Sequence, residues 1–101
     1  MAFWVYLLRC ADDSYYTGHT DNLQWRLGQH QSGELPGHTH ERRPVHLVFS
    51  QDFQTREEAL SMELRLKDWS RARKKALINN DGAAVNRLGR DKHLHQRKLS
   101  A

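Results

Sequence analysis

The chain has 101 residues, of which 38% are hydrophobic and 28% are charged. This length suits one domain with a modest core, because two cores would leave each half too little buried surface to be stable. The longest apolar run, Phe3 to Leu8, is far shorter than the ~20 residues of a membrane span. It also lacks the charged start of a secretory signal, so we expect a cytoplasmic protein without a membrane partner.

The formal net charge of +4 is concentrated at the C-terminal end of the chain. Residues 1 to 85 hold eleven Lys/Arg and eleven Asp/Glu, whereas residues 86 to 101 hold five Lys/Arg and one acid. A local basic cluster nevertheless occurs in the balanced part, and it consists of Arg65, Lys67, Arg71, Arg73, Lys74 and Lys75. Such a cluster suits contacts with phosphates, although charge runs are more often solvated helix faces.

The N-terminal segment predicts a β-hairpin. Phe3 to Cys10 is dense in apolar, aromatic and β-branched residues, and a polar turn separates it from Tyr15 to Gly18. The near-continuous apolarity predicts a sheet that is covered on at least part of both faces. Cys10 is the sole cysteine and cannot form an internal disulfide. As a strand residue, it is expected to be a small buried hydrophobe rather than a nucleophile.

A helix is predicted next, with Thr20 or Asp21 as its N-cap and an end near Gln31. Gly33 supplies the stop, as glycine often does just past a helix end. Residues 32 to 43 mix glycine, proline and histidine, which predicts a loop without a core of its own. The run from Pro44 to Ser50 then predicts a third strand, because proline is tolerated at the first position of a strand.

Two further helices are predicted. Thr55 to Glu58 forms a capping box, and the ridge that the second helix buries is expected to be Ala59, Met62, Leu66 and Trp69. Ser70 caps a third helix that runs to about Asn79. Periodicity is then lost, and residues 91 to 101 are polar and basic, which predicts frayed helix or disorder.

These elements predict an α/β (α+β) fold in which a small three-stranded, mainly antiparallel sheet is flanked by three helices. Residues 1–80 are expected to form this domain, and residues 81–101 a basic, flexible C-terminal tail. The three tryptophans, Trp4, Trp25 and Trp69, are expected to pack in or against the core rather than to stack on bases.

Several short motifs occur in a specific order along the chain. They are Val5-Tyr6-Leu7, Tyr16-Thr17-Gly18 and the helical pattern Asn-Leu-x-x-Arg-Leu-x-x-His over residues 22–30. In this order they resemble the GIY-YIG nuclease domain, most closely its small single-domain bacterial members. The tracts Leu7-Leu8-Arg9-Cys10-Ala11-Asp12 and Arg42-Arg43-Pro44-Val45 are similar to tracts of those members. The resemblance runs from about Trp4 to Ile78.

The resemblance implies roles for individual residues. Tyr6 and Tyr16 would be the motif tyrosines, Gly18 the motif glycine and Arg26 the catalytic arginine. Glu63 would be the metal-binding carboxylate, for Mg²⁺ or Mn²⁺, and His30 a further active-site residue. The first motif departs from the family name because it reads Trp4-Val5-Tyr6, the second has Thr17 in the middle, and His38 stands where close relatives often have tyrosine. The implied activity is a divalent-metal-dependent endonuclease that acts on DNA, in repair, recombination or related processing.

Elementary chemistry supports these roles. Phosphodiester hydrolysis builds negative charge on the nonbridging oxygens, and the permanently charged, planar guanidinium of Arg26 suits them. A single carboxylate such as Glu63, completed by phosphate oxygens and water, is a common way to hold Mg²⁺. A tyrosine is a poor base at its usual pKa of ~10. Tyr6 therefore needs either a lowered pKa or the role of a proton relay.

Plainer interpretations stay open. Without the motif, the two tyrosines would be packing residues, Arg26 a solvated helix residue and Glu63 a surface charge paired with Lys67. The alternative function is a non-catalytic nucleic-acid-binding module with the same fold. In either case the expected nucleic-acid contacts are His38, His40, Arg71, Lys74 and Lys75. The expected substrate is DNA, with RNA as an open alternative, and a protein partner or homodimer is an expected source of target selection.

Seven histidines also raise the question of zinc. His30, His38, His40 and His46 could converge, but no cysteine pair or standard helical ligand spacing organises them. A structural zinc site made from these histidines is therefore disfavoured.

Overall fold

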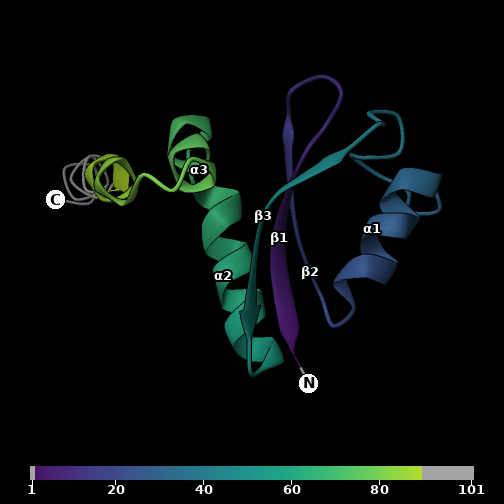
Figure 1. Ribbon diagram of the computed structural model, residues 1–101, viewed down its shortest axis with the longest axis horizontal. Coiled ribbons are helices and arrows are strands. Elements are labelled where there is room, and N and C mark those ends of the chain that lie inside the picture. Colours follow the sequence, from purple (N-terminus) through teal and green to yellow (C-terminus); the bar gives the residue numbers. More distant parts are fainter. Residues whose placement is uncertain (1, 90–101) are drawn as a thin grey trace, which may run out of the picture. The chain divides into compact units, whose positions relative to one another are not determined.

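The computed structural model describes residues 2–89, which form a three-stranded antiparallel sheet and four helices. The strands are β1 (Phe3–Arg9), β2 (Tyr15–Thr20) and β3 (His46–Phe53), in the order β2-β1-β3 (Figure 1). The labelled helices are α1 (Leu23–Ser32), α2 (Arg56–Asp68) and α3 (Arg71–Ile78), and residues 82–89 are also helical. The α+β fold class is confirmed, with one helix more than expected. The chain divides into two compact units between Lys67 and Asp68.

The central strand β1 pairs antiparallel with both of its neighbours. In the hairpin with β2, Tyr6 lies opposite Gly18. The third strand begins at His46 rather than at Pro44, because a proline has no N–H to give to the ladder. It also extends to Phe53, and its register against β1 shifts between Leu7 and Leu8.

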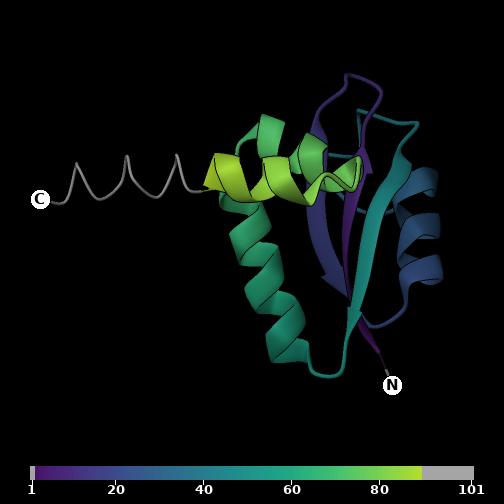
Figure 2. The same cartoon turned by 60° about the vertical axis from the view of Figure 1, so that its left-hand side comes forward.

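The two faces of the sheet are covered by different helices. Side chains alternate along a strand, so Tyr6 and Leu8 share one face of β1 and Val5 and Leu7 share the other. Leu23 and Leu27 of α1 pack against the cluster that contains Tyr6 and Leu8. In both views α2 lies on the opposite side of the sheet from α1 (Figures 1 and 2). The expected coverage of both faces is therefore present.

Helix α1 has an N-cap different from the expected one. The side chain of Asn22 accepts a hydrogen bond from the backbone N–H of Trp25, so Asn22 is the cap rather than Thr20 or Asp21. The Thr20 hydroxyl instead accepts from the Asn22 N–H at 3.1 Å, which bends the chain into the helix. Gly33 ends the helix in the left-handed conformation, with a φ of 79°, as expected.

Helix α2 begins with the expected capping box, because Thr55 and Glu58 exchange hydrogen bonds. Its buried ridge, however, consists of Ala59, Glu63 and Leu66, so the carboxylate belongs to the inner face. Met62 flanks this ridge and is only half-buried. The ridge prediction was also wrong for Trp69, which follows the helix end and belongs to the second unit.

Within the second unit, Ser70 caps α3 as expected, and Asp81 caps the segment 82–89 by accepting from the Ala84 N–H. Arg73 connects the two helices of this unit, because its Nε donates to the Val85 carbonyl at 3.0 Å. Its guanidinium also lies 3.7 Å from the centre of the Trp69 ring. Residues 82–89, which were expected to belong to a flexible tail, are helical. The basic segment 91–101 lies outside the described residues.

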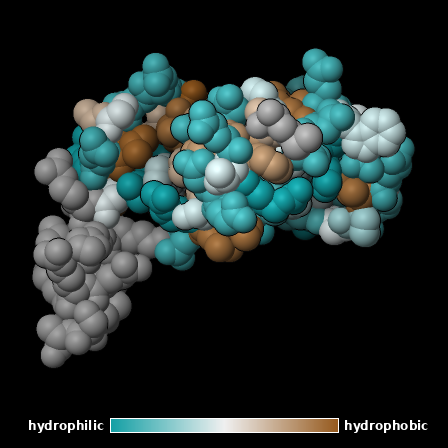
Figure 3. All heavy atoms as spheres, turned by 90° about the horizontal axis from the view of Figure 1, so that it is seen from below, coloured by the Kyte–Doolittle hydropathy of each residue, from teal (hydrophilic) through white to brown (hydrophobic). Residues whose placement is uncertain are grey.

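Among the described residues, the exposed large hydrophobic side chains are Trp25, Leu47, Leu60 and Leu64. Figure 3 shows one face on which hydrophilic side chains dominate and apolar ones gather in small separate patches. Trp25 is 67% exposed, contrary to the packing expected for it, because it lies on α1 away from Leu23 and Leu27. Within residues 2–89, no helix is long and apolar enough to cross a membrane.

Candidate active site

Tyr6 is the central residue of the candidate site. Its ring is buried, and its hydroxyl lies 2.8 Å from Nε2 of His30 on α1. The other ring nitrogen of His30, Nδ1, lies 2.9 Å from the Thr39 hydroxyl. All three residues are buried, so the chain Tyr6–His30–Thr39 joins β1, α1 and the loop before β3. This loop therefore contributes a buried residue, although no core was expected in it.

The environment sets the protonation of these groups. Burial raises the pKa of Tyr6 well above its usual range, and the neighbouring Tyr16 adds to the rise, as does the charge of Glu63 more weakly. Burial also lowers the pKa of His30, and the positive charge of Arg26 acts in the same direction. At neutral pH we therefore expect a protonated phenol beside a neutral imidazole. Burial therefore acts against the first of the two possibilities for Tyr6, a lowered pKa.

The Tyr16 ring contacts the rings of two histidines. Its ring meets the His30 ring edge-on, with 5.1 Å between the centroids, and its centroid is 6.3 Å from that of Tyr6. It also stacks with the ring of His38, with 6.3 Å between the centroids and an interplanar angle of 23°. Tyr16 is half-buried, so part of it is available to a ligand. Gly18, two residues further along β2, gives the Tyr6 hydroxyl room to lie over the edge strand.

Arg26 brings a positive charge to the same face. It is half-buried on α1, and its charge acts on both Tyr6 and His30. Among the described side chains, its Nε is the buried nitrogen or oxygen that has no hydrogen-bond partner. A buried donor without a partner costs about 1–3 kcal/mol. A phosphate oxygen is the kind of acceptor that would satisfy it.

Glu63 approaches from the other face of the sheet. Its carboxylate is buried, with Oε2 at 2.9 Å from Nδ1 of His19 and Oε1 at 3.5 Å from Nζ of Lys67. His19 is opposite Val5 in the hairpin, so by strand alternation it lies on the α2 face. The structure therefore places Glu63 beside the edge strand β2, with the sheet between it and the ring of Tyr6. Its charge still reaches the Tyr6 hydroxyl, whose pKa it raises.

The residues predicted to contact nucleic acid lie in different settings. His38 is half-buried and adjoins the site through Tyr16. His40 is exposed, lies 3.0 Å from the Gly33 carbonyl and lines an open hollow with Glu41 and Arg43. The three predicted contacts in the second unit, Arg71, Lys74 and Lys75, are on α3, where Arg71 and Lys75 are exposed and Lys74 is half-buried.

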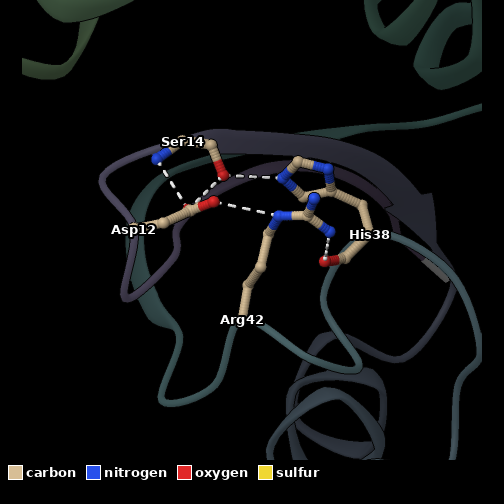
Figure 4. Close-up of polar contacts among 4 residues, drawn as sticks. All are labelled: Asp12, Ser14, His38 and Arg42. Atoms are coloured by element: carbon tan, nitrogen blue, oxygen red, sulfur yellow. Dashed lines mark hydrogen bonds and ion pairs between the residues drawn. The ribbon is translucent and has the colours of Figure 1, made fainter.

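A polar network beside the site was not predicted from the sequence. The Ser14 hydroxyl lies 2.5 Å from Oδ1 of Asp12 and 2.7 Å from Nε2 of His38 (Figure 4). Arg42 donates through Nε to Oδ2 of Asp12 and through Nη1 to the His38 carbonyl, both at 2.9 Å. The histidines considered for zinc lie in separate settings, since His30 bonds Tyr6 and His46 is exposed on β3.

Two more neighbours of the site were missed. Thr39 lies in a loop of glycine and histidine, and nothing in that pattern marks it as buried. His19 directly follows the motif glycine, Gly18. Neighbouring residues of a strand point to opposite faces of the sheet, and this rule is the only signal that His19 faces α2.

Comparison with known proteins identifies the family. Residues 2–76 match the family described as the GIY-YIG catalytic domain. The UPF0213 protein of Bacillus pumilus is 44% identical over 75 residues, which are 74% of this chain and 76% of that protein. A UPF0213 protein of Halobacterium salinarum is 41% identical over 74 residues, which are 73% of this chain and 96% of that protein.

Two solution NMR structures are also similar. A UPF0213 protein from Bacillus halodurans is 38% identical, with a TM-score of 0.53 over 81% of this chain and 87% of that one. A protein from E. faecalis is 33% identical, with a TM-score of 0.57, and the match covers 79% of this chain and 85% of that one. The chain therefore belongs to the GIY-YIG catalytic domain family, which is a family of nucleases.

Proposed function

We propose that this protein is a divalent-metal-dependent endonuclease that hydrolyses phosphodiester bonds in DNA. The observation that carries the proposal is the buried Nε of Arg26, which lacks a hydrogen-bond partner beside the Tyr6–His30 pair. A purely structural arginine would be expected to satisfy a buried donor, because leaving it unpaired is costly. Positioned donors of this kind stabilise the charge that develops on phosphate oxygens, and one donor contributes about 10²–10³ in rate.

The Tyr6–His30 pair supplies a route for the proton of the attacking water. In the tautomer with the proton on Nδ1, His30 donates to Thr39 and its Nε2 accepts from the Tyr6 hydroxyl. The phenolic oxygen then accepts a proton from water while the phenol passes its own proton to Nε2. Water becomes the nucleophile, His30 becomes an imidazolium, and Tyr6 ends neutral. The lowered pKa of His30 keeps the ring neutral and ready to accept at neutral pH.

Glu63 is the residue that would hold Mg²⁺ or Mn²⁺. Each carboxylate oxygen contacts one partner, His19 or Lys67, and an ionised carboxylate has about four lone-pair sites, so acceptor capacity remains for a cation. Mg²⁺ commonly uses one or two carboxylates together with substrate phosphates and water. When bound, the ion supplies Lewis-acid polarisation of the phosphoryl group and assists the leaving oxygen.

The substrate would lie across the edge of β2. Arg26 and Tyr6 belong to one face of the sheet and Glu63 to the other, and β2 is the edge strand between them. A phosphate at this edge would be reached from both faces. The half-buried ring of Tyr16 would form the wall beside it.

Target choice would need more than this chain's own charge. The chain is nearly neutral up to residue 85, so a large electrostatic footprint on DNA is lacking. Arg71, Lys74 and Lys75 would add phosphate contacts without reading sequence. We therefore propose a protein partner or homodimer that selects the DNA structure, in a cytoplasmic repair or recombination process.

One observation favours a second candidate, a nucleic-acid-binding module that does not hydrolyse its ligand. Both carboxylate oxygens of Glu63 already have basic partners, as in an ion pair that serves only the fold. This function would retain phosphate binding at Arg26 and lose the metal step.

The deciding experiment incubates purified protein with plasmid, single-stranded and branched DNA in Mg²⁺, Mn²⁺ or EDTA. Arg26→Ala and Glu63→Gln are compared with two matched controls at exposed positions, Arg9→Ala and Glu57→Gln. We expect metal-dependent cleavage that both site variants abolish and both controls retain. Binding without cleavage would select the non-catalytic module, and full activity of either folded site variant would refute the assignment of that residue.

A further inference from the structure

The side chains of Cys10, Asp12 and His38 converge beside the candidate active site. The Cys10 sulfur, a carboxylate oxygen of Asp12 and a ring nitrogen of His38 all lie within 4.8 Å of one another. We propose that these three residues form a zinc-binding site that is separate from the Glu63 position. Thiolate and imidazole ligands select borderline-soft ions such as Zn²⁺ over Mg²⁺, and a carboxylate can complete a mixed set.

The backbone already holds the three ligands in place. The Cys10 N–H donates to the Ser14 carbonyl at 2.8 Å and the Asp13 N–H to the Cys10 carbonyl at 2.9 Å, so the hairpin turn is closed. The Ala11 N–H donates to the Arg42 carbonyl at 2.8 Å, which connects the turn to the loop that carries His38. Little chain entropy would therefore be lost when an ion joins the two segments.

Side-chain adjustment would complete the geometry. Ligand atoms in tetrahedral zinc sites lie about 2.0–2.3 Å from the ion, hence about 3.3–3.7 Å from one another. The ligand atoms now lie within 4.8 Å of one another, so each separation needs to shrink by at most about 1.5 Å, and Asp12 is exposed enough to rotate. The Ser14 hydroxyl now bridges Asp12 and His38 (Figure 4) and would yield its place to the ion. Water would fill the fourth position.

Arg42 is a charged group beside this cluster, and its contacts are compatible with an ion. Its guanidinium holds Oδ2 of Asp12, whereas Oδ1 faces Ser14 (Figure 4). A second bond to the His38 carbonyl fixes the backbone of that ligand. Partners of this kind orient metal ligands in many sites. The thiolate and carboxylate together balance the charge of Zn²⁺, which offsets the repulsion from Arg42.

This zinc site differs from the histidine-only set considered from the sequence, because it depends on the buried Cys10. Because His38 stacks on Tyr16, a zinc ion bound to His38 would hold one wall of the candidate active site in place. The role of the ion would therefore be structural. Its existence does not depend on whether the protein cleaves DNA.

Cobalt substitution tests the proposal with a spectroscopic signal. The full chain, without an affinity tag, is titrated with Co²⁺ and then with Zn²⁺, in the wild type and in Cys10→Ser, His38→Asn and Asp12→Asn. The matched control is His46→Asn, an exposed histidine of β3. We expect one equivalent of Co²⁺, a thiolate-to-cobalt charge-transfer band in the near ultraviolet, and displacement of Co²⁺ by Zn²⁺.

The variants separate the possible outcomes. Cys10→Ser should abolish the charge-transfer band. His38→Asn should lower the affinity for Co²⁺ at least about 10-fold, because the loss of a residue that merely hydrogen-bonds a metal ligand already has an effect of that size. The control His46→Asn should bind Co²⁺ like the wild type. Absence of the band in the wild type would overturn the proposal. The proposal would also be overturned if His38→Asn and Asp12→Asn both bound Co²⁺ with the affinity of the wild type. These two variants test the site even if Cys10→Ser fails to fold. Nuclease activity is not a readout here, so failure of the proposed nuclease function would not affect the result.

Discussion

Gly18 lies opposite Tyr6 in the hairpin, and a Cβ at residue 18 would stand 2.5 Å from the phenolic oxygen. The glycine is therefore required for space rather than for an unusual backbone angle. We expect Gly18→Ala to displace the Tyr6 ring, to destabilise the fold by about 1–3 kcal/mol and to reduce cleavage strongly. Urea unfolding and cleavage assays would measure both effects.

A matched control for this substitution is Gly28→Ala on α1, where a Cβ would meet nothing within 4 Å. It should stabilise the fold by about 0.5–1 kcal/mol, because alanine favours a helix over glycine. Equal stability of the two variants would contradict the steric role of Gly18.

Removal of the Tyr6 hydroxyl separates packing from chemistry. Tyr6→Phe keeps the buried ring but leaves Nε2 of His30 without its partner. We expect a loss of about 1–3 kcal/mol in stability. Cleavage, measured where the variant is fully folded, should fall about 10²–10⁴-fold through loss of the relay. Destabilisation with undiminished cleavage would show that Tyr6 is only a core residue.

The pH dependence should follow His30. Its pKa is lowered from the ordinary value of 6.5, mainly by burial, so the unfolded chain binds the proton more readily than the folded one. Its contribution to stability is thus complete above pH 6.5 and is lost as the pH falls from 6.5 toward the lower folded value. Cleavage should decline on the acid side over the same range, because only the neutral ring accepts a proton.

His30→Gln should remove this acid-side loss of stability, which thermal melts across the pH range would detect. An activity profile whose acid limb is centred above pH 6.5 would contradict the assignment.

Arg26 should be expendable for folding. Because its buried Nε has no partner, Arg26→Met removes a desolvated donor and keeps a long apolar stem. We expect unchanged or increased stability together with loss of cleavage. Chemical denaturation compared with activity would show this dissociation, and a large loss of stability would instead identify Arg26 as a structural residue.

Local rules predicted the elements whose ends depend on neighbouring residues. Gly33 as a helix stop, the capping box at Thr55 and the cap at Ser70 each follow from hydrogen bonds a few residues apart. The helix over 82–89 was missed because the residues that follow its cap, Asp81, are glycine and alanine. Such small residues bury little apolar surface and give no clear apolar pattern.

Longer-range relations could not be obtained in this way. The motif order located Tyr6, Tyr16, His30 and Arg26, and the structure brings the first three into contact and directs the charge of Arg26 at Tyr6 and His30. The position of Glu63 across the sheet depends on which strand forms the edge, which no local pattern specifies. The meeting of Cys10 with His38 likewise depends on how a loop folds back on the hairpin.

The packing of Tyr6 has a consequence for the evolution of this domain. Tyr6 belongs to the hydrophobic cluster with Leu8, Cys10 and Val45, so the fold itself would select against its loss. Arg26 has no such protection, since its buried nitrogen burdens the folded state. In a lineage that abandoned hydrolysis, the arginine should drift first while the tyrosine persists. A descendant that retains both tyrosine motifs but lacks this arginine would thus fit the non-catalytic alternative.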